Sequence, residues 1–393
     1  MSKTFEHNVA IIGGGPAGAM TAIYLSKYGI DTCIIEKNNF PREILCGEFL
    51  SCEVTEALTN LNFFNEFMNL SPVKINRFKC YNETGTVLST TLYFPAYSIK
   101  RSIFDTFLLN KAVEMGTKIY QPVKVQSIKK YGDKYLLKVK DSNNIESIIK
   151  SNFVLAAYGK QNIIDRILKR DFISISSNYN GVKFHLPNDV FLENPPNVVS
   201  IYFSREIYCG LNRVSANETT LCFLEKRTNH NKSARYRLID LTNENEYFGN
   251  LFNNNFNDII YDLPIYGTGN IYFGKKNVVE NGIFMIGDAA GVIAPLTGDG
   301  IGMAFQSAEL ISRLLKDHLN GKFNISELKR FYIDEWQLLF SKRVRIALLI
   351  QYIVMQNGLR KFGLKLIKPF PLVLRNLTGL SRSLTELNKY DYI

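Results

Sequence analysis

Val9-Ala-Ile-Ile-Gly-Gly-Gly-Pro-Ala-Gly18 is the stretch that decides the fold. The apolar run from Asn8 to Ile12 predicts a strand buried in a parallel sheet. Gly13, Gly15 and Gly18 then fit the pattern G-x-G-x-x-G. In that pattern the first glycine permits a tight turn, the second lets a pyrophosphate approach the backbone, and the third lets a helix pack closely on the strand.

The residues after this loop continue the same pattern. Pro16 suits a helix start, and Ala17 to Lys27 has the apolar spacing of an amphipathic helix whose N-terminus would offer N–H groups to phosphate. Asp31 to Glu36 reads as a second strand that ends in an acid. An acid at this distance from the glycines typically holds ribose hydroxyls. We therefore predict that Gly13, Gly15, Pro16, Ala17, Gly18, Glu36 and Lys37 bind a dinucleotide.

A second glycine-rich segment lies far along the chain, at Ile283-Phe-Met-Ile-Gly-Asp-Ala-Ala-Gly291 and Pro295-Leu-Thr-Gly-Asp-Gly-Ile-Gly-Met-Ala304. Gly282 to Ile286 reads as a strand with Asp288 at its carboxyl end, where ligands bind in open α/β sheets. Asp288 would hold a ribityl hydroxyl or, alternatively, serve as a helix N-cap. Glycines 298, 300 and 302 would open a helix over Met303 to Leu315. Together, the two segments predict one long dinucleotide, FAD.

Three further stretches strengthen this interpretation: Phe40-Pro-Arg-Glu-Ile-Leu-Cys-Gly-Glu-Phe-Leu-Ser51, Arg101-Ser-Ile-Phe-Asp-Thr-Phe-Leu108 and Val154-Leu-Ala-Ala-Tyr-Gly-Lys160. With them the chain resembles the p-hydroxybenzoate hydroxylase superfamily, nearest the branch of geranylgeranyl reductases, flavin-dependent halogenases and related monooxygenases. Tyr158 stands where that family has an aspartate, so the family's way of engaging NAD(P)H is altered here. The resemblance completes the expected cofactor-binding set with Arg42, Cys46, Gly47, Arg101, Val125, Ala157, Gly159, Gly287, Asp288, Pro295, Gly298, Gly300 and Ile301.

Several of these residues have simpler interpretations. Arg42 and Arg101 could be surface charges. Cys46 could be a small buried hydrophobe, a residue lining the flavin pocket or a catalytic thiolate. Tyr208 is the retained member of an aromatic pattern that the reductases carry, and it could be either a packed sheet residue or a catalytic one. Cys46 and Tyr208 are the weak catalytic candidates, and no residue stands out as a proton donor.

The motifs predict a mixed α/β fold in which a Rossmann-like FAD-binding domain is interleaved with a β-sheet substrate domain. The FAD-binding domain would take residues 1–75, 98–168 and 275–330, the substrate domain 76–97 and 169–274, and a basic, apolar, helical region 331–393. Short β-like runs are expected at Ile173–Ile175, Val182–His185, Val198–Phe203 and Thr219–Phe223. The asparagine-rich stretch from Asn243 to Asn257 suggests a loop or lid.

Composition narrows the class of protein. The six cysteines have no zinc-site spacing and the four histidines are scattered, so we expect no metal and reduced thiols in a cytoplasmic protein. The net charge of +11 is concentrated after Gln337, where apolar runs alternate with basic residues and no acid occurs before Glu386. This region could contact an anionic membrane, cap the substrate domain or bind the phosphate of a carrier-bound substrate. No nucleic-acid motif accompanies the charge.

Three reaction classes share the resembled scaffold: oxygenation after reduction by NAD(P)H, reduction of a C=C bond, and halogenation. The single Trp336 lies outside the tryptophan halogenases' motif, which disfavours halogenation. The sequence therefore favours a monooxygenase acting on a hydrophobic metabolite or lipid, with a prenyl-type reductase as the alternative. A flavin-binding redox sensor or scaffold is the non-enzymatic alternative.

Overall fold

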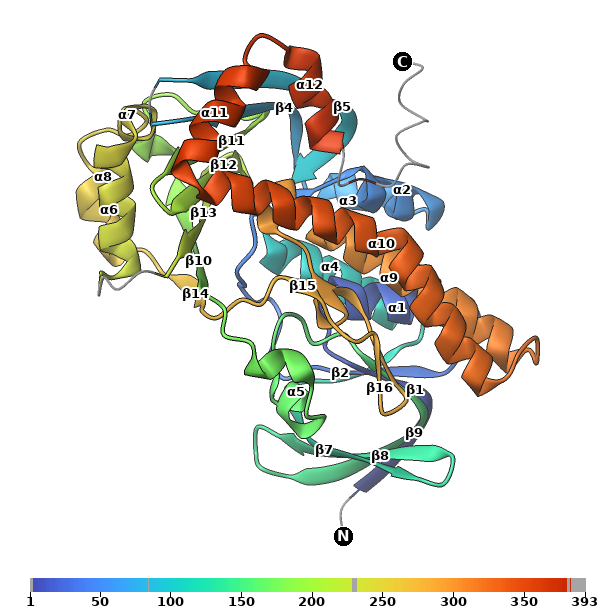
Figure 1. The fold of residues 1–393 in the computed structure, drawn as a ribbon. Helices are drawn as coiled ribbons and strands as arrows, with labels where there is room; N and C mark the ends of the chain where they lie inside the picture. The colour runs from blue at the N-terminus through green and yellow to red at the C-terminus, as the bar shows by residue number, and fades with distance from the viewer. Residues whose placement is uncertain (1–2, 84, 228–231, 380–381, 383–393) are drawn as a thin grey trace.

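The computed structural model describes residues 3–83, 85–227, 232–379 and 382, and it has the mixed α/β class that the sequence predicts. Two large sheets lie at opposite ends of the molecule, and a bundle of long helices packs between them (Figure 1). The helical C-terminal region is confirmed as far as Gly379, while the parts of that prediction covering 380–381 and 383–393 lie outside the described residues.

The first sheet has a parallel centre in the order β17-β9-β1-β2-β6. Its strands are β1 (Lys3–Ile12), β2 (Thr32–Ile35), β6 (Lys118–Tyr120), β7 (Val123–Tyr131), β8 (Lys134–Asp141), β9 (Glu146–Ala156), β16 (Val279–Glu280) and β17 (Ile283–Met285). β1 begins before the expected Asn8 because residues Lys3 to His7 already pair with β9. β7 and β8 form an antiparallel hairpin that continues into β9.

Three helices cover this sheet: α1 (Pro16–Lys27), α4 (Arg101–Glu114) and α9 (Gly300–Leu319). Shorter helices lie nearby: α2 (Cys52–Asn60), α3 (Phe64–Asn69) and α5 (Ile163–Ile167). The expectation that α1 is amphipathic is wrong, because every residue from Pro16 to Leu25 is buried. The sheet lies on one side of α1, and α4 and α9 lie on the others, so no face is left for solvent.

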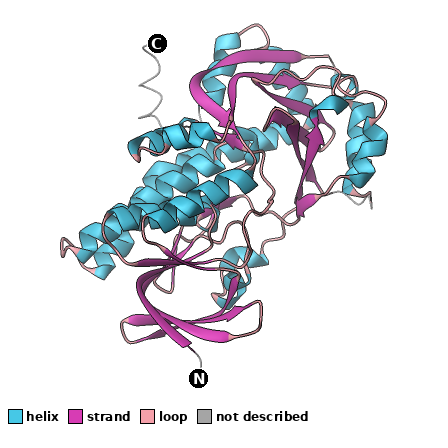
Figure 2. Cartoon of the chain, turned by 180° about the vertical axis from the view of Figure 1, so that it is seen from behind, coloured by secondary structure: helices cyan, strands magenta, loops and turns pink. Residues whose placement is uncertain are grey.

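The second sheet has the order β14-β10-β13-β12-β11-β4-β5-β3. In Figure 2 it stands at the upper end of the molecule, away from the N-terminus. Its strands are β3 (Phe49–Leu50), β4 (Val73–Tyr81), β5 (Val87–Ser98), β10 (Tyr179–Pro187), β11 (Val198–Ser204), β12 (Ile207–Arg213), β13 (Glu218–Lys226) and β14 (Tyr266–Thr268). One face packs against α6 (Ala234–Glu244), α7 (Glu246–Gly249) and α8 (Phe256–Asp262) through Val182, Phe184 and Phe223. We call the opposite face, which carries Lys183, Tyr208 and Cys222, the inner face.

The C-terminal helices pack against the inner face. They are α10 (Ile325–Met355), α11 (Asn357–Ile367) and α12 (Pro371–Gly379). Met355 and Leu374 from these helices share an apolar cluster with Tyr208 and Leu224 of the sheet. β15 (Gly274–Lys275) and β18 (Gly291–Val292) form a small separate ladder beside α10. No helix among the described residues is long and apolar enough to cross a membrane.

Two local predictions are wrong. Ile173–Ile175 is not a strand, because hydrogen bonds from Ile173 to Arg170 and from Ile175 to Phe172 close a 3-10 turn over Asp171–Ser174. The segment from Asn243 to Asn257 is not a loop or lid, because it contains all of α7 and the start of α8. The buried Asn245 side chain accepts a hydrogen bond from the Phe248 amide and so caps α7.

Candidate cofactor and substrate site

The carboxyl ends of β1, β2, β9 and β17 meet at one edge of the first sheet. Gly13, Glu36, Ala157 and Gly287 follow these strands in turn. Gly13 has a φ of 107°, and a Cβ on it would lie 2.5 Å from the Ala157 carbonyl oxygen. A side chain is therefore excluded by both backbone conformation and space.

The two glycine-rich segments are in contact at this edge. A Cβ on Gly18 would overlap the carbonyl oxygen of Gly13, so the helix can approach the turn only with glycine there. A Cβ on Gly287 would lie 2.9 Å from the Cβ of Ala17. The strand ends and the N-terminus of α1 thus form a single cradle, as the sequence predicts for a dinucleotide.

Glu36 is held in position by backbone amides. Its carboxylate accepts hydrogen bonds from the Gly14 amide at 2.8 Å and the Asn38 amide at 2.9 Å, and the side chain is buried. Each oxygen keeps capacity for a second hydrogen bond, so the carboxylate could also receive ribose hydroxyls. Lys37 is exposed beside it. The ribose-binding role of these two residues remains a prediction.

Arg42 borders the space in front of Gly15. Its Nη2 lies 3.4 Å from the position of a Gly15 Cβ and 3.8 Å from Asp105 Oδ2. Its buried Nε has no hydrogen-bond partner among the described residues. A buried, unpaired cationic donor beside the N-terminus of a helix is suited to a phosphate. The residues present therefore fit the pyrophosphate of a dinucleotide.

Arg101 is buried rather than a surface charge. Its Nε and Nη2 donate to the two Asp105 oxygens at 2.6 and 2.8 Å. Burial alone would lower the pKa of Arg101, but the charge of Asp105 outweighs it and raises the pKa. Because this guanidinium is already engaged with Asp105, any contact with a cofactor would use its remaining N–H groups.

The remaining predicted cofactor residues surround the same cradle. Val125 and Ile301 are buried, Gly159 has a φ of 87°, and Gly300 is the first residue of α9. Asp288 lies in a 3-10 turn, so its alternative role as a helix N-cap is wrong, and Asp299 holds the N-cap position of α9. Asp288 Oδ2 lies 3.4 Å from Lys160 Nζ and is partly exposed, which leaves it able to accept a hydroxyl.

The Pro295–Thr297 turn and Gly298 lead into α9. Gly298 has a φ of 64°, and a Cβ there would lie 3.0 Å from the Phe49 ring. Asp299, next in the chain, is buried with the guanidinium groups of Arg343 and Arg382. Arg382 also donates to the Thr297 carbonyl at 2.9 Å. The C-terminal region thus fixes the loop, which sequence reasoning missed because these arginines lie more than forty residues after Asp299.

Cys46 and Gly47 lie between the cradle and the inner face. The half-buried Cys46 Sγ accepts a hydrogen bond from the Glu48 amide at 3.3 Å. On the inner face, burial raises the pKa of Cys222 to about 12, with smaller electrostatic contributions from Cys46, Lys183 and Lys160. Groups from the cradle and from the second sheet therefore border one space, which is where a flavin held by the cradle would meet a substrate.

Tyr158, which replaces the aspartate of the resembled family, and the retained Tyr208 are both packed side chains. Tyr158 donates to Asp165 Oδ1 at 2.5 Å and accepts from Arg170 at 3.1 Å, and Arg170 also binds the Ala289 carbonyl. Tyr158 therefore stabilises the turn after β17. Tyr208 is buried, and burial raises its pKa. Its hydroxyl faces the Leu296 backbone without making a hydrogen bond of normal geometry. The catalytic roles of Tyr208 and Cys46 remain predictions.

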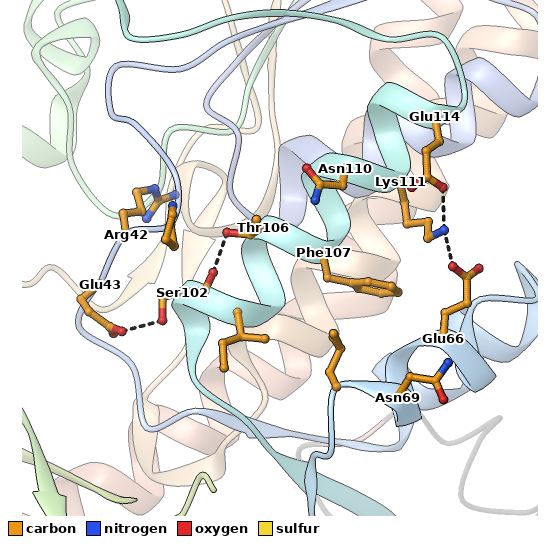
Figure 3. A pocket seen from close by; sticks show the side chains of 13 residues that line it. Arg42, Glu43, Glu66, Asn69, Ser102, Thr106, Phe107, Asn110, Lys111 and Glu114 are labelled. Carbon is orange, nitrogen blue, oxygen red and sulfur yellow. Dashed lines mark hydrogen bonds and ion pairs between the residues drawn. The ribbon is translucent and has the colours of Figure 1, made fainter.

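A cavity of about 810 Å³ runs along the outer side of α4 (Figure 3). Arg42 and Glu43 lie at one end, where Ser102 Oγ donates to Glu43 at 2.6 Å. Lys111, paired with Glu66 and Glu114, lies at the other end. The cavity shares Arg42 with the dinucleotide cradle, and Glu43 connects it to the inner face through Lys183 at 2.7 Å.

Comparison with known proteins agrees with this geometry. Residues 6–243, more than half of the chain, match the family model described as FAD binding domain. The chain belongs to the FAD binding domain family. Its cofactor is therefore FAD. Residues 212–344 also match the model described as squalene epoxidase.

Relatives within this family have several activities. Digeranylgeranylglycerophospholipid reductase 3 of Methanosphaera stadtmanae is 24% identical over 337 residues, which cover 84% of this chain and 82% of that protein. A 1H-pyrrole-2-carbonyl-[peptidyl-carrier protein] brominase of Pseudoalteromonas luteoviolacea is 28% identical over 201 residues, 48% of each chain.

Solved structures show the same fold. A geranylgeranyl bacteriochlorophyll reductase-like protein of Thermoplasma acidophilum has a TM-score of 0.76 at 17% identity, covering 96% of this chain and all of that one. Anhydrotetracycline hydroxylase from Streptomyces rimosus has a TM-score of 0.72 at 16% identity, covering 96% of this chain and 76% of that one.

Proposed function

We propose that this FAD-dependent oxidoreductase is a monooxygenase that hydroxylates or epoxidises a hydrophobic substrate and takes its electrons from NAD(P)H. The observation that carries the proposal is the inner face. Tyr208, Leu224 and Met355 form an apolar wall that contacts Leu296 of the Pro295–Thr297 turn. A substrate held there would lie away from water and next to the flavin.

Different residues of the chain would bind FAD, hold the turn before α9 and orient the substrate. The N-terminus of α1 and Arg42 would hold the pyrophosphate, and Asp288 would hold the ribityl chain. FAD supplies the redox chemistry when bound. Arg343 and Arg382 would keep the turn before α9 in place through Asp299. The inner face would orient the substrate and exclude water.

The test uses the FAD-loaded protein without a known substrate. The flavin is reduced anaerobically, mixed rapidly with oxygenated buffer and followed by absorbance. A transient spectrum that differs from those of both oxidised and reduced flavin, and that lasts long enough to meet a substrate, is expected. Direct return to the oxidised spectrum would contradict the monooxygenase. Added chloride should leave the transient's decay unchanged, whereas chloride-dependent decay would indicate a halogenase.

Reduction of a C=C bond is the second candidate. It is favoured by Leu45, the residue before Cys46 and Gly47, which packs against the apolar wall, and by the relative from Methanosphaera stadtmanae, whose name is that of a lipid reductase. Anaerobic incubation of the reduced protein with a prenylated lipid distinguishes the candidates. Oxidation of the flavin by that lipid without oxygen would support the reductase.

We further propose that this protein is cytoplasmic and contacts membranes through the C-terminal region. Leu359, Phe362 and Leu366 recur at helical spacing on α11 and are 47, 65 and 55% exposed. Lys361 and Lys365 lie beside them in the sequence. The opposite side of α11 packs on the second sheet. A helix with an exposed apolar stripe and adjacent cations suits an anionic membrane surface.

Vesicle sedimentation tests this contact. Binding to vesicles containing phosphatidylserine is expected, with loss of binding in Phe362→Ser. The variant Tyr131→Ser, an aromatic residue 80% exposed on the hairpin of the first sheet, is the matched control. Equal sedimentation of the wild type and Phe362→Ser would remove the membrane proposal. A carrier-bound substrate, as the brominase's name states for that protein, would then be tested by binding to a loaded carrier protein.

A further inference from the structure

A buried cluster of charged side chains joins the 43–48 segment to the inner face. Its centre is Glu48, which is fully buried and has a φ of 57°, in the left-handed region that side chains rarely adopt. Its carboxylate accepts hydrogen bonds from the Arg101 amide at 2.8 Å, Lys183 Nζ at 3.0 Å and His185 Nε2 at 2.7 Å, and from the Thr220 hydroxyl. A strained residue with four donors is held where it is by its surroundings.

The cluster is not an open metal centre. Glu43, Glu48 and His185 have ligand atoms close enough together to hold a cation. Lys183 Nζ, however, lies 2.7 Å from Glu43 and 3.0 Å from Glu48, so its ammonium group already supplies a positive charge to both carboxylates. A metal ion would have to displace a buried ammonium group that is bound to both of its carboxylate ligands.

The charged groups of the cluster hold one another in their ionised forms. Burial alone would raise the pKa of Glu48, but the hydrogen bond from His185 and the charge of Lys183 lower it to about 2. Despite burial, the pKa of Glu43 is lowered by Lys183 and that of Lys183 is raised by the two carboxylates. Two carboxylates and one ammonium leave a net charge of −1, which an imidazolium at His185 would neutralise.

Among the described residues that bond to, pair with or face His185, Glu48 is the charged one. Thr220 lies opposite it on β13, and the Tyr266 ring of β14 lies 6.4 Å away between centroids. Because Nε2 is bound to Glu48, the carboxylate orients the ring and fixes its tautomer. Nδ1 makes no hydrogen bond with any described residue, and the side chain is 9% exposed. Nδ1 is thus the atom available for exchanging a proton.

The cluster borders the same space as Cys46. Lys183 is paired across the strands with Cys222, whose thiol interacts electrostatically with Cys46 and Glu48. His185 lies two residues after Lys183 on β10 and on the same face of the sheet. The cluster is therefore a polar continuation of the apolar wall formed by Tyr208 and Leu224.

We propose that His185, oriented by Glu48, is the residue that exchanges protons between solvent and the substrate space. The inference rests on the proposed function. Hydroxylation of R–H consumes dioxygen, one hydride from NAD(P)H and one proton, and yields R–OH and water. His185 would deliver that proton from Nδ1 to the oxygen that leaves as water, and would then recover a proton from solvent. Glu48 and Lys183 keep their charges throughout.

The experiment uses FAD-loaded His185→Gln and His185→Ala, with dioxygen as the probe. The rate at which the reduced protein regains the oxidised flavin spectrum is measured across roughly pH 5.5 to 9, which spans the range where histidine side chains change charge in proteins. The wild type should show a single-proton dependence, and His185→Gln should flatten it and slow the return by roughly tenfold or more. Added imidazole should restore the rate in His185→Ala.

His7→Gln is the matched control. His7 also pairs with a carboxylate, Asp31, at 3.1 Å, but it lies in the N-terminal half of β1, away from the cradle at the carboxyl end of that strand. Its pH profile should match that of the wild type, and all variants should retain FAD. A profile for His185→Gln that coincides with the wild type, or no response of His185→Ala to imidazole, would overturn the inference. Absence of the transient spectrum would instead contradict the monooxygenase, and the pH profile would still decide the role of His185.

Discussion

Gly287 and Ala17 touch across the cofactor cradle, where a Cβ on the glycine would lie 2.9 Å from the Cβ of the alanine. Gly287→Ala should therefore separate β17 from the N-terminus of α1 and release most of the bound FAD. The φ of 59° adds about 1–2 kcal/mol of backbone strain. FAD content is measured from flavin fluorescence after denaturation.

Gly321→Ala is the control for Gly287→Ala. Gly321 has a φ of 76° and nothing within 4 Å of its Cβ position, so it carries the backbone strain without the contact. It should lose some thermal stability but keep its FAD. Equal FAD loss in both variants would show that general destabilisation, not the contact with Ala17, is responsible.

Arg42→Gln should weaken FAD binding. A charge-assisted hydrogen bond contributes about 1.5–3 kcal/mol, so the dissociation constant for FAD should rise roughly tenfold or more. The apoprotein should keep most of its thermal stability, because the Arg42 Nε has no hydrogen-bond partner among the described residues and its ion pair with Asp105 is long, at 3.8 Å. Arg313→Gln, which removes an exposed pair with Glu335, should leave the constant unchanged in a fluorescence titration.

Glu48→Gln should change the stability of the protein in acid. The pKa of Glu48 is lowered to about 2, so its stabilising contribution is present above the unfolded value of about 4.3 and is lost as the pH falls towards 2. The wild type should lose about 3 kcal/mol of unfolding free energy through this window that the variant does not. Denaturant titrations at pH 7 and 3 should record roughly half of this loss, because pH 3 is still about one unit above the folded-state pKa.

Glu6→Gln supplies the comparison for Glu48→Gln, since Glu6 pairs with Lys134 on the exposed surface. It should follow the wild type at both pH values. If Glu48→Gln also follows the wild type, the charges around Glu48 do not stabilise the fold.

Lys276→Met should remove a dependence of stability on alkaline pH. Burial lowers the pKa of Lys276 to about 8, although the charge of Asp288 opposes the shift. Between about 8 and the unfolded value of about 10.4, the unfolded chain binds the extra proton, so stability rises with pH. Thermal unfolding from pH 7 to 10 should show this rise in the wild type and in Lys322→Met, an exposed control, but not in Lys276→Met.

The cofactor half of the site was predictable because its constraints are local. A side chain on Gly18 would clash with Gly13, five residues earlier. A side chain on Gly13 would clash with Ala157, at the end of the adjacent strand. Such restrictions leave a spacing that can be read directly from the sequence. The contact between Gly287 and Ala17 spans most of the chain, but each partner lies within its own recognisable motif.

The substrate half was less predictable because its contacts are long-range. Glu48 and His185 are 137 residues apart, and neither lies in a motif that names the other. The sequence predicts a strand at Val182–His185, and alternation along a strand puts Lys183 and His185 on one face. Which face is covered depends on where α6 and the C-terminal helices pack, and no local pattern states that.

The position of β9 between β1 and β17 has a consequence for synthesis of the protein. β1 contains the first described residues, yet its neighbour β9 begins at Glu146, and β17 follows only at Ile283. A chain emerging from the ribosome can pair β1 with β2, but the other edge of β1 stays open until β9 has been translated, and β9 in turn lacks β17 until Met285. Closing such distant pairs is slow and leaves strand edges open to aggregation. Production of folded protein should accordingly depend on chaperones that shield the nascent N-terminal half.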